Sequence, residues 1–224
     1  MYHKGRKGQD FPQASAKIPG NMGISTISTG GIAMGKISDV VLYTERLILR
    51  PYCPEDAENV FRVVSRKEIA ATTLMIPHPY PRAKVDWWIN FTNNCRQKGT
   101  ACELGIFVKD TGAYIGNTGF PAILPEHRNA EIAYFIDPDR WNQGYGTEAC
   151  RRVVQFGFEM LELERIYGKC MFKNVGSRRI MEKSGLLLEG IARHGVCKWG
   201  QFEDICHFGL IRADWARQGD GSCV

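Results

Sequence analysis

The sequence predicts one α/β (α+β) domain, and three observations lead to this fold class. Short apolar runs with a two-residue period alternate with longer runs in which apolar residues recur every three or four positions. A strand, a glycine turn and a helix start follow one another directly between Glu131 and Ala149. The 224 residues are 44% hydrophobic and 24% charged, which is the balance of a soluble globular protein. Because no run of about 18 apolar residues occurs, a membrane protein is not expected.

Residues 1–40 are predicted to be a flexible N-terminal tail, because Gly, Ser and Thr are frequent there and no helical or strand period is present. The segment holds five basic and two acidic residues, so it carries most of the net charge of +5. The rest of the chain is nearly neutral, which argues against a nucleic-acid-binding surface. A basic tail that binds nucleic acid and a mitochondrial presequence are open alternatives, although the segment has no Arg-rich amphipathic helix.

The folded domain is predicted to span 41–215, and its first half begins with a strand at Thr44–Arg50. Pro54, followed by two acidic residues, predicts the start of a first helix. Apolar residues between 85 and 92 predict a second helix, which ends near Gly99. Two alternating runs flank the turn at 110–112, and they predict an antiparallel hairpin.

The second half of the domain alternates strands and helices. The predicted elements are a strand at Glu131–Ile136, a helix from Thr147 to about Leu161, a strand from Ile166 to Phe172, a helix up to Ser184, and two strands at Leu187–Cys197 and Phe202–Ile211. Ala149 to Met160 would supply the apolar stripe of the first of these helices. Asn174 is a good N-cap for the second helix, and Gly185 is placed to end it. Residues 216–224 are predicted to be a C-terminal tail.

The turn at Gly144-Tyr145-Gly146 is a candidate anion site. Glycines have no Cβ atom to keep an anion from the backbone, and the first N–H groups of the helix and its dipole would point at the anion. Many such turns bind nothing and only connect a strand to a helix. The two common nucleotide motifs, G-x-G-x-x-G with a later acidic residue and G-x-x-x-x-G-K-[ST], are both absent.

The spacing Trp141-x-x-Gly144-x-Gly146 resembles the coenzyme A pyrophosphate loop of the GNAT (Gcn5-related) N-acetyltransferases, in a form similar to the RimJ/RimL-type branch. Two further motifs are similar: T-x-R-L-x-L-R-P from Thr44, and N-x-x-S-x-x-x-x-E-K-x-G from Asn174. The predicted order of elements also matches that of the family. The resemblance implies the GNAT fold, a mixed central sheet of about seven strands, splayed in the middle, with about four helices.

The resemblance further implies that acetyl-CoA is the cosubstrate and that no metal is required. Pantetheine would lie along the splayed strand, and the pyrophosphate would bind the main-chain N–H groups of the loop. The residues implied to bind the coenzyme are Tyr134, Phe135, Ile136, Trp141, Asn142, Gln143, Gly144, Tyr145, Gly146, Thr147 and Asn174. A main-chain N–H near Tyr134 or Phe135 would donate to the oxyanion that develops during transfer.

Two side chains are predicted to move protons. Glu131 would act as the base, directly or through water, or it would instead bind a cationic substrate or an internal Arg. Ser177 would act as the acid, because Met181 stands where many members of the family carry Tyr; its alternative role is a hydrogen bond to pantetheine or to its own helix. His194 is an alternative base or a wall of the site.

The eight cysteines contain no C-x-x-C pair, which indicates reduced thiols in a cytoplasmic protein. Cys206 and His207 are expected to serve packing, and Cys170 is not expected to be a nucleophile.

The predicted function is transfer of the acetyl group of acetyl-CoA to a primary amine by direct transfer in a ternary complex. The acceptor would be a protein N-terminus, an amino acid or a small amine, and the aromatic segment around Pro77–Pro81, Trp87 and Trp88 suits a peptide N-terminus or a small amphipathic amine. No nucleic acid or membrane partner is expected, and the chain would be a monomer or a homodimer. The alternative is a non-catalytic acyl-CoA-binding module of the same fold, which the absence of Tyr at Met181 suggests.

Overall fold

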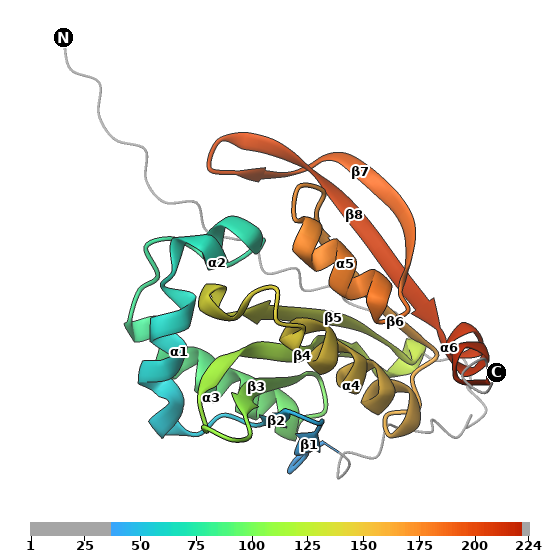
Figure 1. The fold of residues 1–224 in the computed structure, drawn as a ribbon, viewed down its shortest axis with the longest axis horizontal. Coiled ribbons are helices and arrows are strands. Elements are labelled where there is room, and N and C mark those ends of the chain that lie inside the picture. Colours follow the sequence, from blue (N-terminus) through green and yellow to red (C-terminus); the bar gives the residue numbers. More distant parts are fainter. Residues whose placement is uncertain (1–36, 221–224) are drawn as a thin grey trace, which may run out of the picture.

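The computed structural model describes residues 37–220, which form one eight-stranded mixed sheet with helices around it (Figure 1). The strand order is β1-β2-β3-β4-β5-β6-β8-β7. The strands are β1 (Leu42–Tyr43), β2 (Leu47–Arg50), β3 (Cys102–Val108), β4 (Tyr114–Leu124), β5 (Asn129–Ile136), β6 (Arg165–Met171), β7 (Leu187–Lys198) and β8 (Gln201–Ile211). The α-helices are α1 (Ala57–Val64), α2 (Lys67–Thr72), α3 (Ala83–Gln97), α4 (Tyr145–Glu159), α5 (Val175–Lys183) and α6 (Arg212–Asp220). Short 3-10 turns are η2 (Pro54–Asp56), η3 (Pro125–His127) and η4 (Pro138–Arg140).

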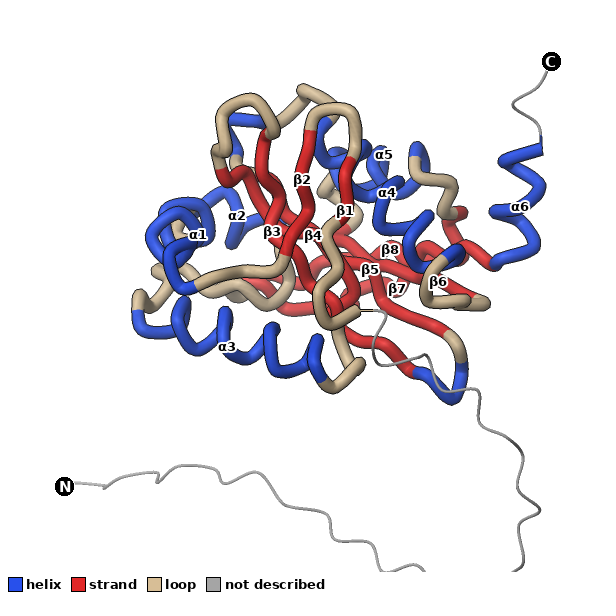
Figure 2. Tube along the Cα trace, turned by 90° about the horizontal axis from the view of Figure 1, so that it is seen from below, coloured by secondary structure: helices blue, strands red, loops and turns tan. Residues whose placement is uncertain are grey.

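Helices cover both faces of the sheet (Figure 2). On one side, which we call the α3 face, α1 and α3 bury Val60, Val85 and Ile89 against aromatic residues of the sheet. On the other side, which we call the α4 face, α4 buries Val153 and Phe156 in the larger core, and α5 lies beside α4 (Figure 1). Successive residues of a strand point to opposite sides of the sheet, so the same strands supply apolar side chains to both cores.

The sheet splays between β5 and β6, its one parallel strand pair within residues 37–220. The two strands pair at Asn129–Arg165, Ala130–Ile166 and Glu131–Tyr167. Beyond Glu131 the pairing stops, although β5 continues to Ile136. The other edge of β5 stays paired with β4 as far as Ile136. The predicted splay is therefore confirmed, and the edge of residues 132–136 that faces away from β4 has no strand partner, although its Ile136 carbonyl accepts a bond from the Trp141 indole.

The predicted fold class is confirmed, and the structure adds three short elements to it. β1 has 2 residues and α2 has 6, which is too short for either to show a period in the sequence. α6 crosses the predicted domain limit at 215, and its Trp215 stacks on Phe158 with ring centroids 5.2 Å apart. Of the predicted tail 1–40, residues 1–36 lie outside the described residues, whereas Ile37 is buried in the core.

The predicted helix ends hold with one exception. The Asn174 side chain caps α5 by accepting a hydrogen bond from the Ser177 N–H at 3.0 Å, and Gly185 follows α5 with φ 90°. The prediction that Met160 belongs to the buried stripe of α4 is wrong. The helix ends at Glu159, and the Met160 side chain is 47% exposed because the chain turns away from the core there.

Candidate active site

The loop between β5 and α4 presents a row of main-chain N–H groups at the mouth of the splay. Gly144 is the N-cap of α4 with φ 83°, and Asn142 also has a left-handed φ of 60°. The indole Nε1 of Trp141 donates to the Ile136 carbonyl at 2.7 Å and fixes the start of the loop. Within residues 37–220, no acceptor is found for the N–H groups of 142–147. These amides are therefore available to an anion, as the sequence motif predicts.

The two glycines of the motif are required for different reasons. Gly144 has a left-handed conformation, which glycine adopts without the steric penalty of a Cβ atom. At Gly146, a Cβ atom would lie 2.7 Å from Cδ1 of Ile180, so this glycine lets α4 pack closely against α5. Gly146 is therefore explained by helix packing, and only its N–H group faces the anion position.

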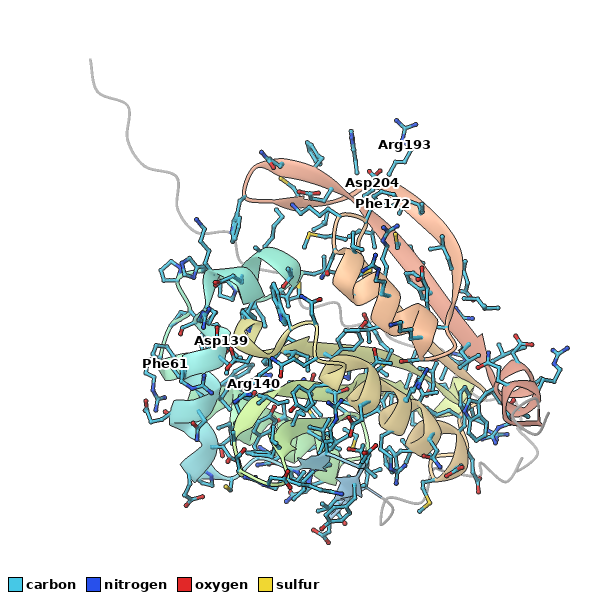
Figure 3. The ribbon with its side chains drawn as sticks, in the orientation of Figure 1. Phe61, Asp139, Arg140, Phe172, Arg193 and Asp204 are labelled. Carbon is cyan, nitrogen blue, oxygen red and sulfur yellow. The ribbon has the colours of Figure 1, made fainter. Side chains whose placement is uncertain are left out.

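Two arginines, Arg62 of α1 and Arg66 at the start of α2, hold one side of the loop. Arg62 Nη1 lies 2.8 Å from Oδ2 of Asp137, whose side chain is buried, and Arg66 Nη1 lies 3.2 Å from Oδ2 of Asp139. Figure 3 shows Asp139 and Arg140 beside Phe61 of α1. These anchors are not predicted from the sequence. Arg62 is in α1 and Arg66 is the extended residue that precedes α2, so no helical spacing links the two side chains.

Glu148, in the first turn of α4, holds the other side. Its carboxylate accepts hydrogen bonds from Thr44 Oγ1 at 2.6 Å, from Arg46 N at 2.9 Å and from Arg46 Nε at 2.7 Å. Burial raises the pKa of Glu148, but the bonds from Thr44 and Arg46 outweigh burial and keep the pKa below its usual value. Arg46 also donates to the Gln143 carbonyl at 3.1 Å. The β1–β2 connection thus fixes the N-terminus of α4.

A pair of hydroxyl groups lies on the α4 face of β5. The Tyr134 hydroxyl lies 3.0 Å from Ser177 Oγ and donates to the Ser177 carbonyl at 3.0 Å. Burial raises the pKa of Tyr134 well above its ordinary value, so the phenol stays protonated. Met181 is buried in the core and offers no proton. A phenol is therefore present near Ser177, but it comes from β5 rather than from position 181.

Glu131 lies on the opposite side of β5. It alternates with Ala130 and Ile132, which are buried on the α4 face, so its side chain points to the α3 face. Its Oε1 lies 3.2 Å from Lys169 Nζ, and this ion pair joins β5 and β6 at the closed end of the splay, where their pairing stops. The structure thus gives Glu131 an internal cation, a lysine rather than an arginine. Phe135 also packs on the α3 face.

Asn174 already uses both polar atoms of its side chain. Oδ1 caps α5, and Nδ2 donates to the Thr72 carbonyl at 3.0 Å, which ties the start of α5 to the end of α2. A hydrogen bond from Asn174 to pantetheine would have to replace the bond to Thr72.

A cavity of about 430 Å³ lies next to Asn174, between α2 and the tip of the β7–β8 hairpin. Its walls include Thr72, Lys198 and Trp199. The loop that precedes α3 reaches this side of the domain, because Lys198 Nζ donates to the Ile76 carbonyl at 3.2 Å. Trp88 packs edge-on against Tyr52 with centroids 4.9 Å apart, whereas Trp87 is exposed.

His194 is placed away from the splay, on the β7–β8 hairpin. The main-chain N–H of His194 donates to Asp204 Oδ1 at 2.8 Å, and the exposed imidazole ring stacks on Phe202. In Figure 3, Asp204 and its neighbour Arg193 lie on this outer hairpin, apart from Asp139 and Arg140. The structure does not bring His194 to the other predicted site residues.

The thiols near the site are not activated. Burial raises the pKa of Cys170 to about 11, which leaves the thiol protonated, in agreement with the prediction that it is not a nucleophile. Cys206 is buried, as predicted. His207 is exposed because it points to the opposite side of β8, so the prediction that it serves packing is wrong.

Two classes of site are not found in the described part of the chain. Residues 37–220 contain no group of three or more His, Cys, Asp or Glu side chains that could hold a metal ion. The helices in this range are also too short or too polar to cross a membrane.

The same fold occurs in solved acetyltransferases. The ribosomal L7/L12 alpha-N-protein acetyltransferase RimL, solved in complex with coenzyme A, superposes with a TM-score of 0.71 at 18% sequence identity, over 77% of this chain and 98% of RimL. This protein therefore has the fold of RimL, with a mixed sheet that splays between β5 and β6.

Sequence comparison identifies the family. The Acetyltransferase (GNAT) domain matches residues 46–187. The uncharacterized N-acetyltransferase p20 of Bacillus licheniformis is 31% identical over 175 residues, which cover 78% of this chain and 98% of p20. The ribosomal-protein-serine acetyltransferase of Escherichia coli is 28% identical over 109 residues, 49% of this chain and 60% of that protein. The chain belongs to the GNAT family of acetyl-CoA-dependent N-acetyltransferases.

Proposed function

We propose that this protein transfers the acetyl group of acetyl-CoA directly to a primary amine within a ternary complex. One observation carries the proposal: β5 loses its parallel partner after Glu131, immediately before the loop whose N–H groups at 142–147 are unpaired. A ligand with an extended polar arm and an anionic end would satisfy both sets of backbone groups. Acetyl-CoA has this form, with pantetheine as the arm and pyrophosphate as the anion.

The proposed coenzyme contacts follow from this arrangement. The pyrophosphate would accept hydrogen bonds from the N–H groups of 142–147, helped by the positive end of the α4 dipole. Pantetheine would bond the free edge of residues 134–136. The amide of Tyr134 would then donate to the oxyanion of the tetrahedral intermediate, because the N–H of Phe135, the other predicted donor, faces Asn117 of β4.

The proton steps are divided between the two sides of β5. Ser177 and the hydroxyl of Tyr134 are on the α4 face, and we assign to Ser177 the proton that the leaving thiolate takes up. We assign the base to the α3 face, which is the side of Glu131 and Phe135. Glu131 is a weaker candidate than the sequence indicates, because its carboxylate is already paired with Lys169.

We propose a protein N-terminus as the acceptor, with amino acids and small amines as the other members of the same class. Two of the compared proteins are named for acetylating ribosomal proteins, one of them at serine. The cavity between α2 and the β7–β8 hairpin is open to solvent and lies next to Asn174, so an extended chain end could reach the splay there.

The test is thiol release from acetyl-CoA, measured with peptides that begin with Ser or Ala, with free amino acids and with small amines. The expected result is acceptor-dependent thiol release together with a matching mass increase of one acetyl group on the acceptor. Calorimetric binding of acetyl-CoA without acceptor-dependent thiol would instead support the non-catalytic acyl-CoA-binding module. Absence of acetyl-CoA binding would reject both functions.

We also place the protein in the cytoplasm. All seven cysteines in the described range are free thiols, and Cys170 and Cys206 are unbonded although they are opposite each other in β6 and β8. Unpaired cysteines of this kind are typical of a reducing compartment.

A further inference from the structure

A second carboxylate, Glu103, lies on the α3 face of the sheet. Its neighbours in β3, Cys102 and Leu104, are buried in the core on the α4 face, so the Glu103 side chain points the other way. Asn117 Nδ2 lies 3.4 Å from Glu103 Oε1 and donates to it. Asn117 in turn accepts a hydrogen bond from the Tyr52 hydroxyl at 2.7 Å. Glu103 is therefore on the same side of the sheet as Glu131 and Phe135.

Glu103 has no cationic partner. Among residues 37–220, Lys, Arg and His side chains form ion pairs with many carboxylates, but none with Glu103. The titratable and polar groups that interact with it are Tyr52 from the segment after β2, Cys102 from β3, and Tyr114 and Asn117 from β4. Arg96 of α3 interacts with Cys102 and Asp39. The Arg96 guanidinium is used elsewhere, because it donates to the Ser38 carbonyl at 2.6 Å and to Asn93 Oδ1 at 3.0 Å.

The floor between Glu103 and the splay is free of large side chains. Glu103 is opposite Gly119 in the sheet, and Gly119 is opposite Ala133 of β5. Gly119 cannot be replaced, since its φ is 147° and a Cβ atom there would lie 2.1 Å from the Cys102 carbonyl oxygen. Along this row of the sheet, the side chains next to the Glu103 carboxylate are therefore the hydrogen of Gly119 and the methyl group of Ala133 in the unpaired part of β5. Two strand spacings amount to about 10 Å, which a glutamate side chain and one water can bridge.

We propose that Glu103 is the general base of the transfer and takes a proton from the acceptor ammonium, directly or through one water. The nitrogen keeps the electron pair of the broken N–H bond and uses it to form the N–C bond to the thioester carbonyl. The C–S bond then breaks with its electron pair on sulfur. Nitrogen loses its second proton to water. Ser177 gives its proton to the thiolate and takes one back from solvent, and the proton on Glu103 passes to solvent, so one proton is released per transfer.

This inference rests on the proposed function and names a residue of the same site. Burial raises the pKa of Glu103 to about 7, against a smaller opposing effect of the bond from Asn117. A base with a pKa near the working pH is half ionised there and still accepts a proton readily. A carboxylate without a cationic partner, near Tyr52 and Tyr114, also attracts a cationic group, and an amine is cationic at neutral pH.

The first experiment compares pH profiles of kcat/KM for an N-terminal serine peptide. The wild-type rate is expected to rise with pH and to level off near 7, where Glu103 is ionised. Glu103→Gln is expected to lose about 10²–10⁴-fold at pH 7. Its rate should rise only near the pKa of the peptide amine, about 8. Glu103→Asp should recover part of the loss. Glu126→Gln, on the exposed turn η3, is the matched control and should behave as wild type.

The outcomes are separable. The assignment of Glu103 is overturned if Glu103→Gln keeps a kcat/KM within about threefold of wild type. It is also overturned if Glu131→Gln, instead of Glu103→Gln, removes the rise of kcat/KM near pH 7. Acetyl-CoA binding by calorimetry shows whether each variant still folds and binds coenzyme. If wild type itself does not bind acetyl-CoA, the proposed function fails rather than the assignment.

A second measurement does not depend on turnover. Carbon-13 NMR of glutamate-labelled protein should show one side-chain carboxyl that titrates near pH 7, absent from Glu103→Gln and present in Glu126→Gln. A spectrum in which every glutamate titrates below pH 6 would reject the proposal.

Discussion

At the scale of residues, the two sides of β5 carry different chemistry. Protonated hydroxyls of Tyr134 and Ser177 lie on the α4 face, and carboxylates lie on the α3 face. A transfer reaction needs this division, since the proton donor to sulfur and the proton acceptor from nitrogen act on opposite ends of the bond exchange. The alternation of side chains along a single strand provides it.

Glu103 should lower the stability of the protein at high pH. Its folded pKa of about 7 exceeds the ordinary 4.5, so ionisation is harder in the folded state. The folded state is therefore favoured below 4.5 and loses this advantage as pH rises through 7. Glu103→Gln should match wild type at pH 4.5 and exceed it by about 2 kcal/mol at pH 8. Urea denaturation at both pH values measures this. A stability difference that does not change with pH would contradict it.

The hydroxyl pair should behave as one unit. Ser177→Ala removes the proposed donor to the thiolate, and Tyr134→Phe removes the hydroxyl 3.0 Å from it. Each variant is expected to lower kcat about 10–100-fold, and the double variant should lose little more than either one. Steady-state kinetics with a serine peptide checks this, with the exposed Tyr43→Phe as control. Fully additive losses would show that the two hydroxyls act independently.

At the scale of elements, the splay is useful only because the next loop is held open. Arg62 of α1 and Arg66 at the start of α2 fix this loop, and the β1–β2 connection fixes α4 through Glu148. Neither anchor touches the proposed coenzyme path at residues 134–136, yet both decide where the free N–H groups point.

Gly144→Ala tests the loop geometry. A Cβ atom at φ 83° is strained and would lie 3.3 Å from Arg46 Nη2. A strain of about 1–2 kcal/mol should weaken acetyl-CoA binding about tenfold, because the loop relaxes away from the anion-binding form. Isothermal calorimetry measures the affinity. Gly112→Ala, in the β3–β4 turn with φ 66° and open space around it, carries similar strain away from the site and should leave the affinity unchanged. Equal losses in both variants would contradict a role for the loop.

At the scale of the whole molecule, every residue proposed to touch acetyl-CoA or to move a proton lies between 103 and 177. A protein without residues 1–36, which keeps the buried Ile37, is therefore expected to bind acetyl-CoA within about twofold of the full chain. Acetyl-CoA at 100 times its Kd should stabilise both forms by about 2.7 kcal/mol. Thermal denaturation with and without acetyl-CoA measures this. A loss of binding in the shortened protein would show that the first 36 residues contribute to the site.

Much of this architecture could be predicted because its determinants are local. The Gly144 turn, the Asn174 cap, the hairpin at 110–112 and the order of elements each depend on a few neighbouring residues. Elements of two to six residues, β1 and α2, escaped prediction because a period cannot be recognised over so short a run. Met160 was misplaced because a helical period does not say where the helix stops.

The sequence by itself determined the fold class, the family and the position of the glycine loop that we propose for the anion, since periodicity, caps and glycine turns act between residues close in the chain. Only the tertiary structure decided which groups share a side of the sheet. Glu103 is 28 positions from Glu131, yet strand register places it two strands away on the same face; Tyr134 meets Ser177 across 43 positions. The ion pair that occupies Glu131 and the missing cation at Glu103 likewise depend on contacts between distant segments, and a linear pattern does not encode them.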